Sequence, residues 1–262
     1  MSFRFLSLFL CAAGMMIAAN QPVLRVCADP NNLPFSNQQE QGFENKLAEM
    51  FAAQLGAKLQ YTWWAERKSF IKNSLEAGRC DLVMGLPTSL TSVATTRPYY
   101  QSTYVFVSRH DRNLNVTALS DPRFSKWRIG VHVVGENYAP PAAALARRGI
   151  TANVIGFSLF GPYGEINPAR KLIDAVADGR IDIAIVWGPF AGYFAKKEKA
   201  ALDIVPVSPP MFLAIPFTYA IAAGVRKNDQ PLLTRIDEAI AGNSVEIRRI
   251  LDQYGVPQVK GE

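Results

Sequence analysis

The residues best suited to catalysis or metal binding are few in this sequence of 262 residues, which contains three cysteines and two histidines. Zinc sites have characteristic ligand spacings, and His110 and His132 do not stand at such spacings from Cys27 and Cys80. The sequence also lacks a Gly-x-Ser-x-Gly motif, a His-Glu-x-x-His motif and a Walker-type phosphate loop. We therefore expect a binding protein that is not an enzyme and that carries no metal and no cofactor.

The N-terminal segment 1–19 has the pattern of a signal peptide. Arg4 supplies the positive charge, residues 5–16 form an apolar run, and the small residues Ala18 and Ala19 suit a cleavage site. The apolar run is too short to span a bilayer, although an uncleaved anchor is the alternative. We expect cleavage after Ala19 and a mature chain in the periplasm.

Two cysteines remain in the mature chain, because Cys11 lies within the predicted signal peptide. In an oxidising compartment such a pair is typical of a disulfide. However, Cys27 is expected late in one strand and Cys80 just before another, which could exceed the reach of a bridge. A Cys27–Cys80 disulfide and two small buried thiols therefore both stay open.

Charge and hydropathy exclude several classes of protein. Lysine and arginine number 28 against 22 aspartate and glutamate, a net charge of +6, but the basic residues are scattered. Scattered charges are typical of solvated helix faces, so we expect no nucleic-acid binding. Hydrophobic residues make up 49% of the chain, enough for a large core. Beyond the N-terminus no apolar run reaches the ~20 residues of a membrane span, so we expect no stable membrane insertion.

One pattern occurs twice along the chain. Arg25 opens a short apolar run, and 54 residues later Arg79 stands in the sequence Gly-Arg-Cys-Asp before a second apolar run. Arg128 likewise opens an apolar run, and 52 residues later Arg180 stands in Gly-Arg-Ile-Asp before another. The same order at nearly the same spacing predicts two lobes built alike.

Hydrophobic periodicity predicts strand, helix, strand, helix, strand in each lobe. In the first lobe these elements are expected at 24–28, 43–55, 58–63, 70–77 and 82–84. In the second lobe they are expected at 127–133, 141–148, 153–157, 168–178 and 181–186, with Asn167 as the N-cap of the last helix. Extended runs at 100–108 and 218–225 connect the lobes, and the chain ends with helices at 232–241 and 245–254.

Strands that alternate with helices predict parallel sheets covered on both faces, so the fold class is α/β. We expect lobe 1 to comprise residues 20–109 and 220–262, and lobe 2 residues 110–219. Two lobes with parallel-rich sheets, joined by two extended crossover segments, form a hinged clamp. Its ligand is expected in the cleft, beyond the carboxyl ends of the strands.

This arrangement resembles the type II periplasmic binding proteins, most closely those that bind amino acids. The resemblance rests on Gly42-Phe43, on Ala-Gly-Arg-Cys-Asp at 77–81 and on Pro98-Tyr99.

A narrower resemblance is to the MxaJ/XoxJ-type solute-binding-like proteins of methanol oxidation systems. It rests on the segments 25–36, 61–64, 78–85 and 95–100, which read RVCADPNNLPFS, YTWW, GRCDLVMG and TTRPYY. The resemblance implies a periplasmic accessory protein that binds a PQQ-dependent methanol or alcohol dehydrogenase and assists its maturation or activation. The quinone, with calcium or a lanthanide, would belong to the enzyme.

Two further hypotheses stay open. One is the solute-binding component of an ABC transporter, similar to amino-acid-binding proteins but with altered ligand specificity. The other is a small-molecule lyase, because some proteins of this clamp fold are dehydratases and fold alone does not exclude catalysis.

The charged groups with which amino-acid-binding relatives hold a zwitterion are expected to be absent here. Those relatives place an arginine nine residues before the proline of the Pro-Tyr motif, where this chain has Ser89. Their aspartate after the last strand of lobe 2 is replaced by the sequence Trp-Gly-Pro at 187–189, and Arg97 is the nearest other cation. A missing counter-charge in a closed cleft is costly. We therefore expect a neutral or flat ligand, or an inserted protein side chain.

The candidate cleft residues follow the expected strand ends and are rich in aromatic and amide side chains, which suit such a ligand. They are Asn31, Asn32, Phe35, Trp64, Glu66, Thr88, Ser89, Arg97, Gly135, Glu136, Asn137, Trp187 and Phe190. Some have purely structural alternatives, since Trp187 could fill a gap in the core and Glu136-Asn137 could cap a helix.

Two loops, at 156–167 and 208–217, contain apolar and aromatic residues without helical or strand periodicity. If they are exposed they form a docking patch for the dehydrogenase, and the alternative is that they fold inward over the lobe. The candidate partner contacts are Phe157, Phe160, Tyr163, Met211 and Phe212.

Overall fold

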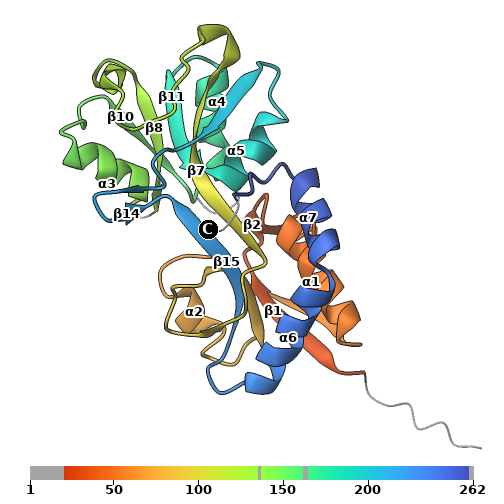
Figure 1. Cartoon of the computed structure of the whole chain (residues 1–262). Helices are drawn as coiled ribbons and strands as arrows, with labels where there is room; N and C mark the ends of the chain where they lie inside the picture. The colour runs from red at the N-terminus through yellow and green to blue at the C-terminus, as the bar shows by residue number, and fades with distance from the viewer. Residues whose placement is uncertain (1–20, 135–136, 162–164, 260–262) are drawn as a thin grey trace, which may run out of the picture.

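A mixed β-sheet runs through both halves of the protein. The computed structural model describes residues 21–134, 137–161 and 165–259. Figure 1 shows two lobes with a pair of long strands crossing between them. Within the described residues the hydrogen-bonded strand order is β10-β8-β11-β7-β15-β5-β1-β4, in a sheet of 11 strands. The expected two-lobed α/β fold is confirmed.

The strands fall into three groups. Those of lobe 1 are β1 (Val23–Ala28), β4 (Lys58–Trp63), β5 (Leu82–Pro87) and β6 (Ala94–Thr95). Those of lobe 2 are β8 (Ile129–Val134), β9 (Asn137–Tyr138), β10 (Val154–Ser158), β11 (Ile183–Trp187) and β12 (Leu202–Pro206). Two small hairpins stand apart, β2 (Asn31–Asn32) with β3 (Ser36–Asn37) and β13 (Met211–Phe212) with β14 (Ile215–Pro216).

The crossing strands are β7 (Tyr100–Arg109) and β15 (Thr218–Val225). They pair with each other in antiparallel register, with Thr218 opposite Thr103. β7 also pairs with β11 and β12 of lobe 2, and β15 pairs with β5 of lobe 1. The lobes therefore share one sheet. Among its described strands, β1 is parallel to β4 and β5, and β8 is parallel to β10 and β11. The other strand pairs of this sheet are antiparallel.

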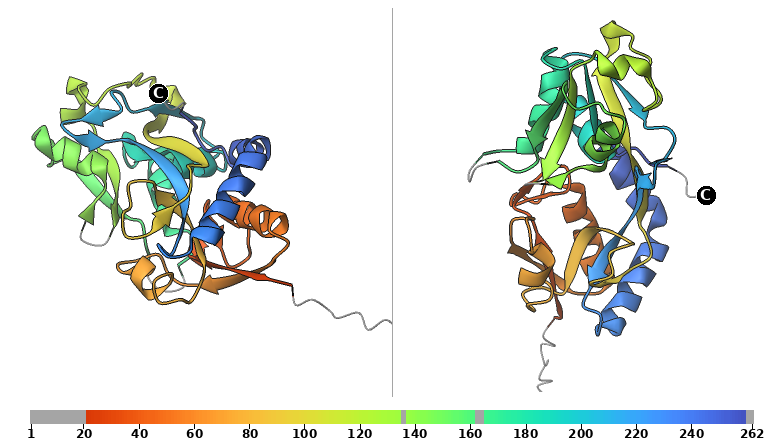
Figure 2. Two further views of the ribbon diagram at one scale, coloured as in Figure 1. Left: turned by 60° about the horizontal axis from the view of Figure 1, so that its bottom comes forward. Right: turned by 90° about the vertical axis from the view of Figure 1, so that its left-hand side faces the viewer.

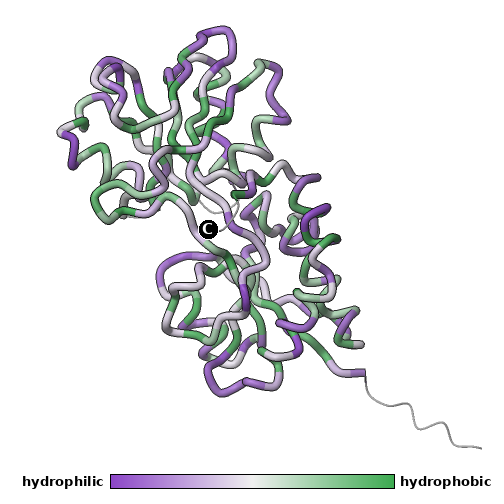
Figure 3. Tube along the Cα trace, viewed as in Figure 1, coloured by the Kyte–Doolittle hydropathy of each residue, from purple (hydrophilic) through white to green (hydrophobic). Residues whose placement is uncertain are grey.

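Helices cover the sheet and enclose the cores. Lobe 1 carries α1 (Phe43–Gln54), α6 (Gln230–Gly242) and α7 (Ser244–Gln253), which pack against one another. Figure 2 shows this helical layer beside the strands of lobe 1. Lobe 2 carries α3 (Pro140–Arg147), α4 (Lys171–Ala177) and α5 (Gly188–Ala195). The apolar stretches lie inside both lobes, in the clusters around Phe51, Phe124 and Phe194 (Figure 3).

Two local predictions differ from the structure for identifiable reasons. α2 spans only Phe70–Asn73, because Ser74 leaves the helical conformation and its buried hydroxyl donates to the Phe70 carbonyl at 2.6 Å. Asn167 does not cap a helix through its side chain. It has a left-handed backbone (φ 51°), and its N–H donates to Oδ1 of Asn31 at 3.1 Å. Asn167 therefore stands at the N-cap position and contacts the other lobe through its N–H, without a capping hydrogen bond from its side chain.

Cys27 and Cys80 form a disulfide, with Cα atoms 5.5 Å apart. The chain already lies beside β1 before β5 begins, since the Asp81 N–H donates to the Arg25 carbonyl at 2.8 Å. This approach brings Cys80 next to β1, so the two cysteines lie close enough to form the bridge although the sequence left this open. The bridge lies in a small core cluster with Phe70, and both cysteines are buried.

Candidate functional site

A cavity of about 390 Å³ lies between the lobes, at the carboxyl ends of the strands. The side of the cavity that lobe 1 forms carries its charged and amide groups. The lining residues from lobe 1 are Asn32, Phe35, Glu44, Glu66, Arg67, Lys68 and Gly85. Among the described residues, those that lobe 2 contributes are apolar or aromatic, namely Val134, Leu159, Phe160, Trp187 and Phe190, and the crossing strands add Tyr100 and Ile221. A second hollow of about 260 Å³ shares Trp187 and Phe190 and extends the apolar side along the crossing strands.

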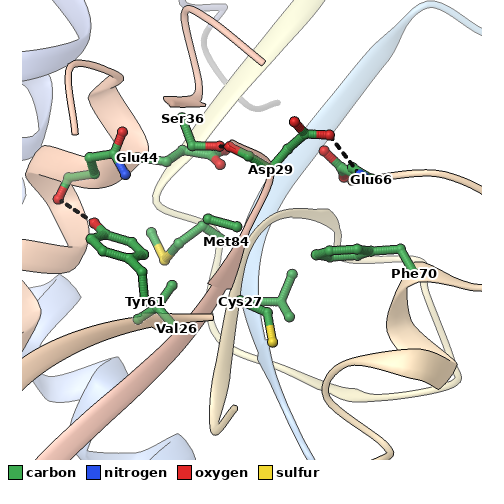
Figure 4. A pocket seen from close by; sticks show the side chains of 12 residues that line it. Val26, Cys27, Asp29, Ser36, Glu44, Tyr61, Glu66, Phe70 and Met84 are labelled. Atoms are coloured by element: carbon green, nitrogen blue, oxygen red, sulfur yellow. Dashed lines mark hydrogen bonds between the residues drawn. The ribbon is translucent and has the colours of Figure 1, made fainter. Parts of the chain in front are cut away.

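Asp29 holds together the loops that form the polar side of the cavity. Its Oδ2 accepts the Glu66 N–H at 2.6 Å, and its Oδ1 accepts the Asn31 N–H at 2.7 Å. The Asn32 side-chain amide donates to Oε2 of Glu66 at 3.0 Å. Figure 4 shows Asp29 between Glu66 and Ser36, at the end of β1. The segments after β1 and β4 are thereby tied together, which places the Glu66 carboxyl at the cavity.

Glu44 reaches the cavity from the first turn of α1. A Cβ atom at Gly85 would lie 2.5 Å from Oε1 of Glu44, so the glycine makes room for the carboxyl. Gly85 has φ of +75°, a conformation that glycine adopts without strain. The Tyr99 hydroxyl lies 3.5 Å from the same Oε1 atom.

The two carboxyl groups have perturbed acidity. Burial raises the pKa of Glu66 to about 7, the negative charge of Asp29 adds to this, and the amide of Asn32 opposes it. Burial also raises the pKa of Glu44 well above its ordinary value, with the charge of Glu66 as the next cause. Near neutral pH, this side of the cavity therefore holds protons that exposed carboxyl groups would have lost.

The aromatic side of the cavity contains two groups of packed rings, one around Phe190 and one around Trp187. Phe35 of lobe 1 packs edge-on against Phe190 at 5.1 Å between ring centroids, and His132 also packs edge-on with Phe190, at 5.2 Å. Trp187 lies 5.4 Å from the Tyr104 ring. Burial lowers the pKa of His132 to about 4, so this ring is neutral at physiological pH. Lobe 2 thus offers the cavity no charge from these residues.

Direct contacts join the lobes at the front of the cavity. The Asn31 side chain donates to the Glu165 carbonyl at 2.5 Å and accepts the Asn167 N–H at 3.1 Å. Arg67 donates to the Gly161 carbonyl at 3.1 Å, and its guanidinium lies 5.8 Å from the centroid of the Phe160 ring. The described conformation is therefore one in which lobes 1 and 2 touch across the cleft.

The structure gathers five of the predicted cleft residues around the cavity. These are Asn32, Phe35, Glu66, Trp187 and Phe190. Asn31 lines a neighbouring hollow of about 480 Å³ and bridges the lobes. Gly135 and Glu136 lie outside the described residues, and Asn137 belongs to β9.

The other predicted cleft residues lie elsewhere. The Trp64 ring packs under the Arg79 guanidinium, at 4.7 Å, and against the cluster that contains the disulfide. Thr88 and Ser89 are exposed in the turn that follows β5. Arg97 lines a separate hollow beside α6 and α7, and its N–H donates to Asp237 at 2.6 Å.

The predicted partner contacts divide between the surface and the interior. Met211 is 57% exposed, whereas Phe212 packs against a core cluster of lobe 2. Phe157 packs against the other core cluster of lobe 2, and Phe160 lines the cavity between the lobes. Tyr163 lies outside the described residues.

Sequence reasoning missed Glu44, although a signal was present. Glu44 stands three, four and seven residues before Leu47, Ala48 and Phe51, which is the spacing of one helix face. An acid on an otherwise apolar helix face is a marker of a buried polar site. Gly85 and Tyr100 carried no comparable signal, because their roles depend on where α1 packs.

The described residues contain no group of three His, Cys, Asp or Glu side chains placed to hold a metal ion. Among them, too, no helix has the length and hydropathy needed to cross a membrane. The arrangement is suited to binding through carboxyl groups and aromatic rings.

The sequence matches the bacterial extracellular solute-binding proteins, family 3, over residues 24–257. It is 30% identical over 248 residues to the protein MoxJ of Methylorubrum extorquens, an alignment that covers 89% of this chain and 81% of MoxJ.

Two solved structures share the fold over almost the whole chain. The MxaJ structure from Methylophaga aminisulfidivorans has a TM-score of 0.80 at 26% identity, covering 90% of this chain and 100% of MxaJ. The periplasmic binding protein XoxJ from Methylobacterium extorquens has a TM-score of 0.75 at 31% identity, covering 91% of this chain and 100% of XoxJ.

Proposed function

This chain belongs to family 3 of the bacterial extracellular solute-binding proteins, as one of the MxaJ/XoxJ type, and we propose that it serves a periplasmic PQQ-dependent methanol or alcohol dehydrogenase. In this proposal it is a non-enzymatic accessory protein that binds the dehydrogenase and assists its maturation or activation. The quinone and its metal belong to the dehydrogenase, and this chain carries no cofactor.

The observation that carries the proposal is the full-length similarity to MoxJ, MxaJ and XoxJ. The composition of the cavity supports it. Trp187 lines the cavity at the position where amino-acid-binding relatives have an acid, and Ser89 is exposed outside it. The two positions at which amino-acid-binding relatives place an arginine and an aspartate therefore carry no charge here, so this chain does not hold a zwitterion in the way those relatives do.

The proposed location is the periplasm, reached through the signal peptide 1–19. The family is extracellular, and the disulfide between Cys27 and Cys80 suits an oxidising compartment. The proposal requires the mature N-terminus to begin at Asn20, which Edman sequencing or mass spectrometry of the secreted protein measures directly.

The predicted partner contacts are Phe157, Phe160, Tyr163, Met211 and Phe212, and the proposed docking surface is centred on Met211, because Phe157 and Phe212 pack against core clusters. Met211, at 57% exposure, is the member most accessible from solvent, on the β13–β14 hairpin of lobe 2. A Met211→Ser variant is expected to weaken association without unfolding the chain, because an exposed side chain contributes little to the core. Val245, 83% exposed on α7 of lobe 1, offers a matched control as Val245→Ser.

The test is a pull-down of the tagged mature chain against periplasmic extract, followed by mixing with the purified apo-dehydrogenase. We expect the dehydrogenase to be retained and its activity after addition of PQQ and metal to rise. Absence of both effects, with dehydrogenase present in the extract, would overturn the proposal.

The alternative is a solute receptor of an ABC transporter, and the cavity of about 390 Å³ favours it, since this volume suits a small molecule. A receptor would show a rise in melting temperature with a defined solute, through preferential stabilisation of the closed form.

A further inference from the structure

The cavity between the lobes combines a buried carboxyl group, that of Glu44, and a half-buried one, that of Glu66, with a wall of aromatic rings. We propose that it binds an organic cation, an ammonium or guanidinium group on an apolar stem. The charge lies against Glu44 and Glu66, and the stem against Phe35, Trp187 and Phe190. This inference goes beyond the proposed function, because it names the chemistry of what enters the cavity and holds whether or not the chain serves a dehydrogenase.

Glu44 is the strongest element of the site. Its residue is 9% exposed and lines the cavity. Within the described part of the chain its Oε1 has one distant contact, the Tyr99 hydroxyl at 3.5 Å, and its Oε2 has neither a hydrogen bond nor an ion pair. A buried carboxyl group without a partner keeps its proton, and a cation in the cavity would supply the partner that stabilises its ionised form.

Glu66 presents a second carboxyl group to the same cavity. It accepts one amide hydrogen bond, from Asn32 at 3.0 Å, and forms no ion pair with any described residue. Two other shielded acids are paired with arginine, Asp81 with Arg25 at 2.6 Å and Glu198 with Arg170 at 2.8 Å, and the buried Asp29 accepts two backbone N–H groups. In a chain of net charge +6, two cavity carboxyl groups without an ion pair are an exception.

The basic residues of the cavity lining do not neutralise these carboxyl groups. Arg67 is exposed, donates to the Gly161 carbonyl at 3.1 Å and lies over the Phe160 ring. Lys68 is exposed and, among the described residues, pairs with neither glutamate. Exposed basic groups keep their hydration, so neither replaces a partner inside the cavity.

The aromatic side favours a cation over a neutral ligand. Ring faces attract ammonium and guanidinium groups, and this attraction strengthens when water is excluded. Trp187 lines both hollows, and the ring of Phe190 packs against Phe35, so aromatic surface lies opposite the carboxyl side. A volume of about 390 Å³ accommodates a short amine.

The test compares n-pentylamine with 1-pentanol, which have the same five-carbon chain and differ in charge, and adds agmatine as a guanidinium probe. Isothermal titration of the chain without residues 1–19, at pH 8, uses n-pentylamine and agmatine as cations and 1-pentanol as the neutral control. We expect both cations to bind about tenfold or more tightly than the alcohol. Glu44→Gln and Glu66→Gln should each reduce the affinity for the cations about tenfold, whereas Glu76→Gln, at an exposed position, should leave it unchanged.

A further probe, Nα-acetyl-lysine methylamide, distinguishes the sources of the cation. If this probe binds as the free amines do, the site accepts a lysine side chain of a protein. If only the free amines bind, the site accepts a solute. Both results support a cation site. Equal binding of 1-pentanol and n-pentylamine, or unchanged cation binding in both glutamine variants with native circular dichroism, overturns the inference. Neither result bears on the dehydrogenase, which is tested by the pull-down.

Discussion

The two lobes use the same internal frame but present different chemistry to the cavity between them. In lobe 1, Arg25 donates to Asp81 at 2.9 Å and to the carbonyl three residues before that aspartate at 3.1 Å. In lobe 2, Arg128 donates to Asp182 at 3.1 Å and to the carbonyl of Gly179, again three residues before the aspartate, at 2.9 Å. The repeat detected in the sequence is therefore a repeated hydrogen-bonded structure.

The lobes differ two residues after each arginine. Lobe 1 has Cys27 there, bonded to Cys80, whereas lobe 2 has Gly130, where a Cβ atom would lie 2.4 Å from Cδ1 of Ile181. Ile181 and Cys80 each directly precede the aspartate of the repeat. Lobe 1 thus joins these two positions by a disulfide. Lobe 2 packs the Ile181 side chain against Gly130 at the equivalent positions.

The lobes differ again at the cavity. The fourth residue after the arginine is Asp29 in lobe 1 and His132 in lobe 2, and both are buried. Asp29 organises Glu66 through a hydrogen bond, while His132 is a neutral ring packed on Phe190. The same frame therefore supports different strand lengths, since β1 ends at Ala28 whereas β8 continues past His132 to Val134, and the residue at the fourth position sets the character of the wall.

The largest expected effect is loss of the disulfide, which only lobe 1 contains among the described residues. Cys27→Ala/Cys80→Ala should lower the free energy of unfolding by about 4 kcal/mol, because the bridge closes a loop with a sequence separation of 53. Urea denaturation measures this. Ile181→Val, at the equivalent place in lobe 2, should cost only about 1 kcal/mol. Equal losses would contradict the distinction between the lobes.

The Arg–Asp pairs come next. Burial alone would raise the pKa of Asp81, but the hydrogen bonds from Arg25 and Arg226 outweigh it and lower the pKa. Arg128 lowers the pKa of Asp182 in the same way. Each folded pKa lies below the unfolded value, so the stabilisation is present above about pH 4 and is lost as the pH falls through the folded pKa.

We therefore expect Asp81→Asn to destabilise by about 3 kcal/mol at pH 7, and Asp182→Asn by about 2 kcal/mol. Asp81 should lose more, because its second arginine, Arg226, donates at 2.9 Å, whereas the second arginine of Asp182, Arg112, donates at 3.4 Å. Thermal unfolding at pH 7 and pH 3 provides the check, because both variants should approach the wild type at the lower pH. A difference that persists at pH 3 would point to packing rather than charge.

The cavity acid should destabilise the protein at alkaline pH. The pKa of Glu66 is about 7 in the folded state against about 4.3 unfolded, so the folded state binds more protons and stability falls as the pH rises through this window. Asp29, Glu44, Arg67 and Lys68 are the charged groups around it.

Glu66→Gln should therefore stabilise the chain at pH 8 by about 2 kcal/mol and have little effect at pH 4. In lobe 2 the pH dependence of stability has the opposite sign. The folded pKa of His132, about 4, lies below its unfolded value of about 6.5, so this residue lowers stability as the pH falls from 6.5 to 4. Denaturation curves from pH 4 to 8 measure both. Parallel curves for wild type and Glu66→Gln would contradict the assigned acidity.

The smallest effect concerns the contact between the lobes. Asn31→Ala removes the hydrogen bonds to the Glu165 carbonyl and the Asn167 N–H, for an expected cost of about 1 kcal/mol. Small-angle X-ray scattering should show a larger mean radius of gyration, because the lobes separate more often. Asn73→Ala, at an exposed position at the end of α2, is the control. An unchanged radius would show that other contacts hold the lobes.

Local sequence patterns predicted most of the frame. β4 at Lys58–Trp63 and β15 at Thr218–Val225 occupy the expected residues, because alternation and uninterrupted apolar runs are strong local signals. α2 was predicted too long, since the hydrogen bond of Ser74 that ends it is invisible in the hydrophobic pattern. Asn167 occupies the predicted N-cap position ahead of Pro168, but its side chain makes no capping hydrogen bond, and its N–H donates to Asn31, 136 residues away.

The candidate site was predictable only in part. Phe35, Glu66 and Trp187 were found because residues that follow strands gather at one edge of a sheet. Trp64 follows a strand as well, yet it packs on Arg79 away from the cavity. Sequence gives the end of a strand but not the direction in which the next side chain points.

The sequence by itself determined the two-fold repeat, the order of strands and helices and the family, because these depend on local periodicity and on motifs read in order. Only the tertiary structure decided that the lobes share one sheet, that Cys27 reaches Cys80, and that Glu44 and Glu66 face one cavity. Those outcomes depend on packing between segments distant in sequence, where burial and neighbouring charge, rather than residue type, set the chemistry.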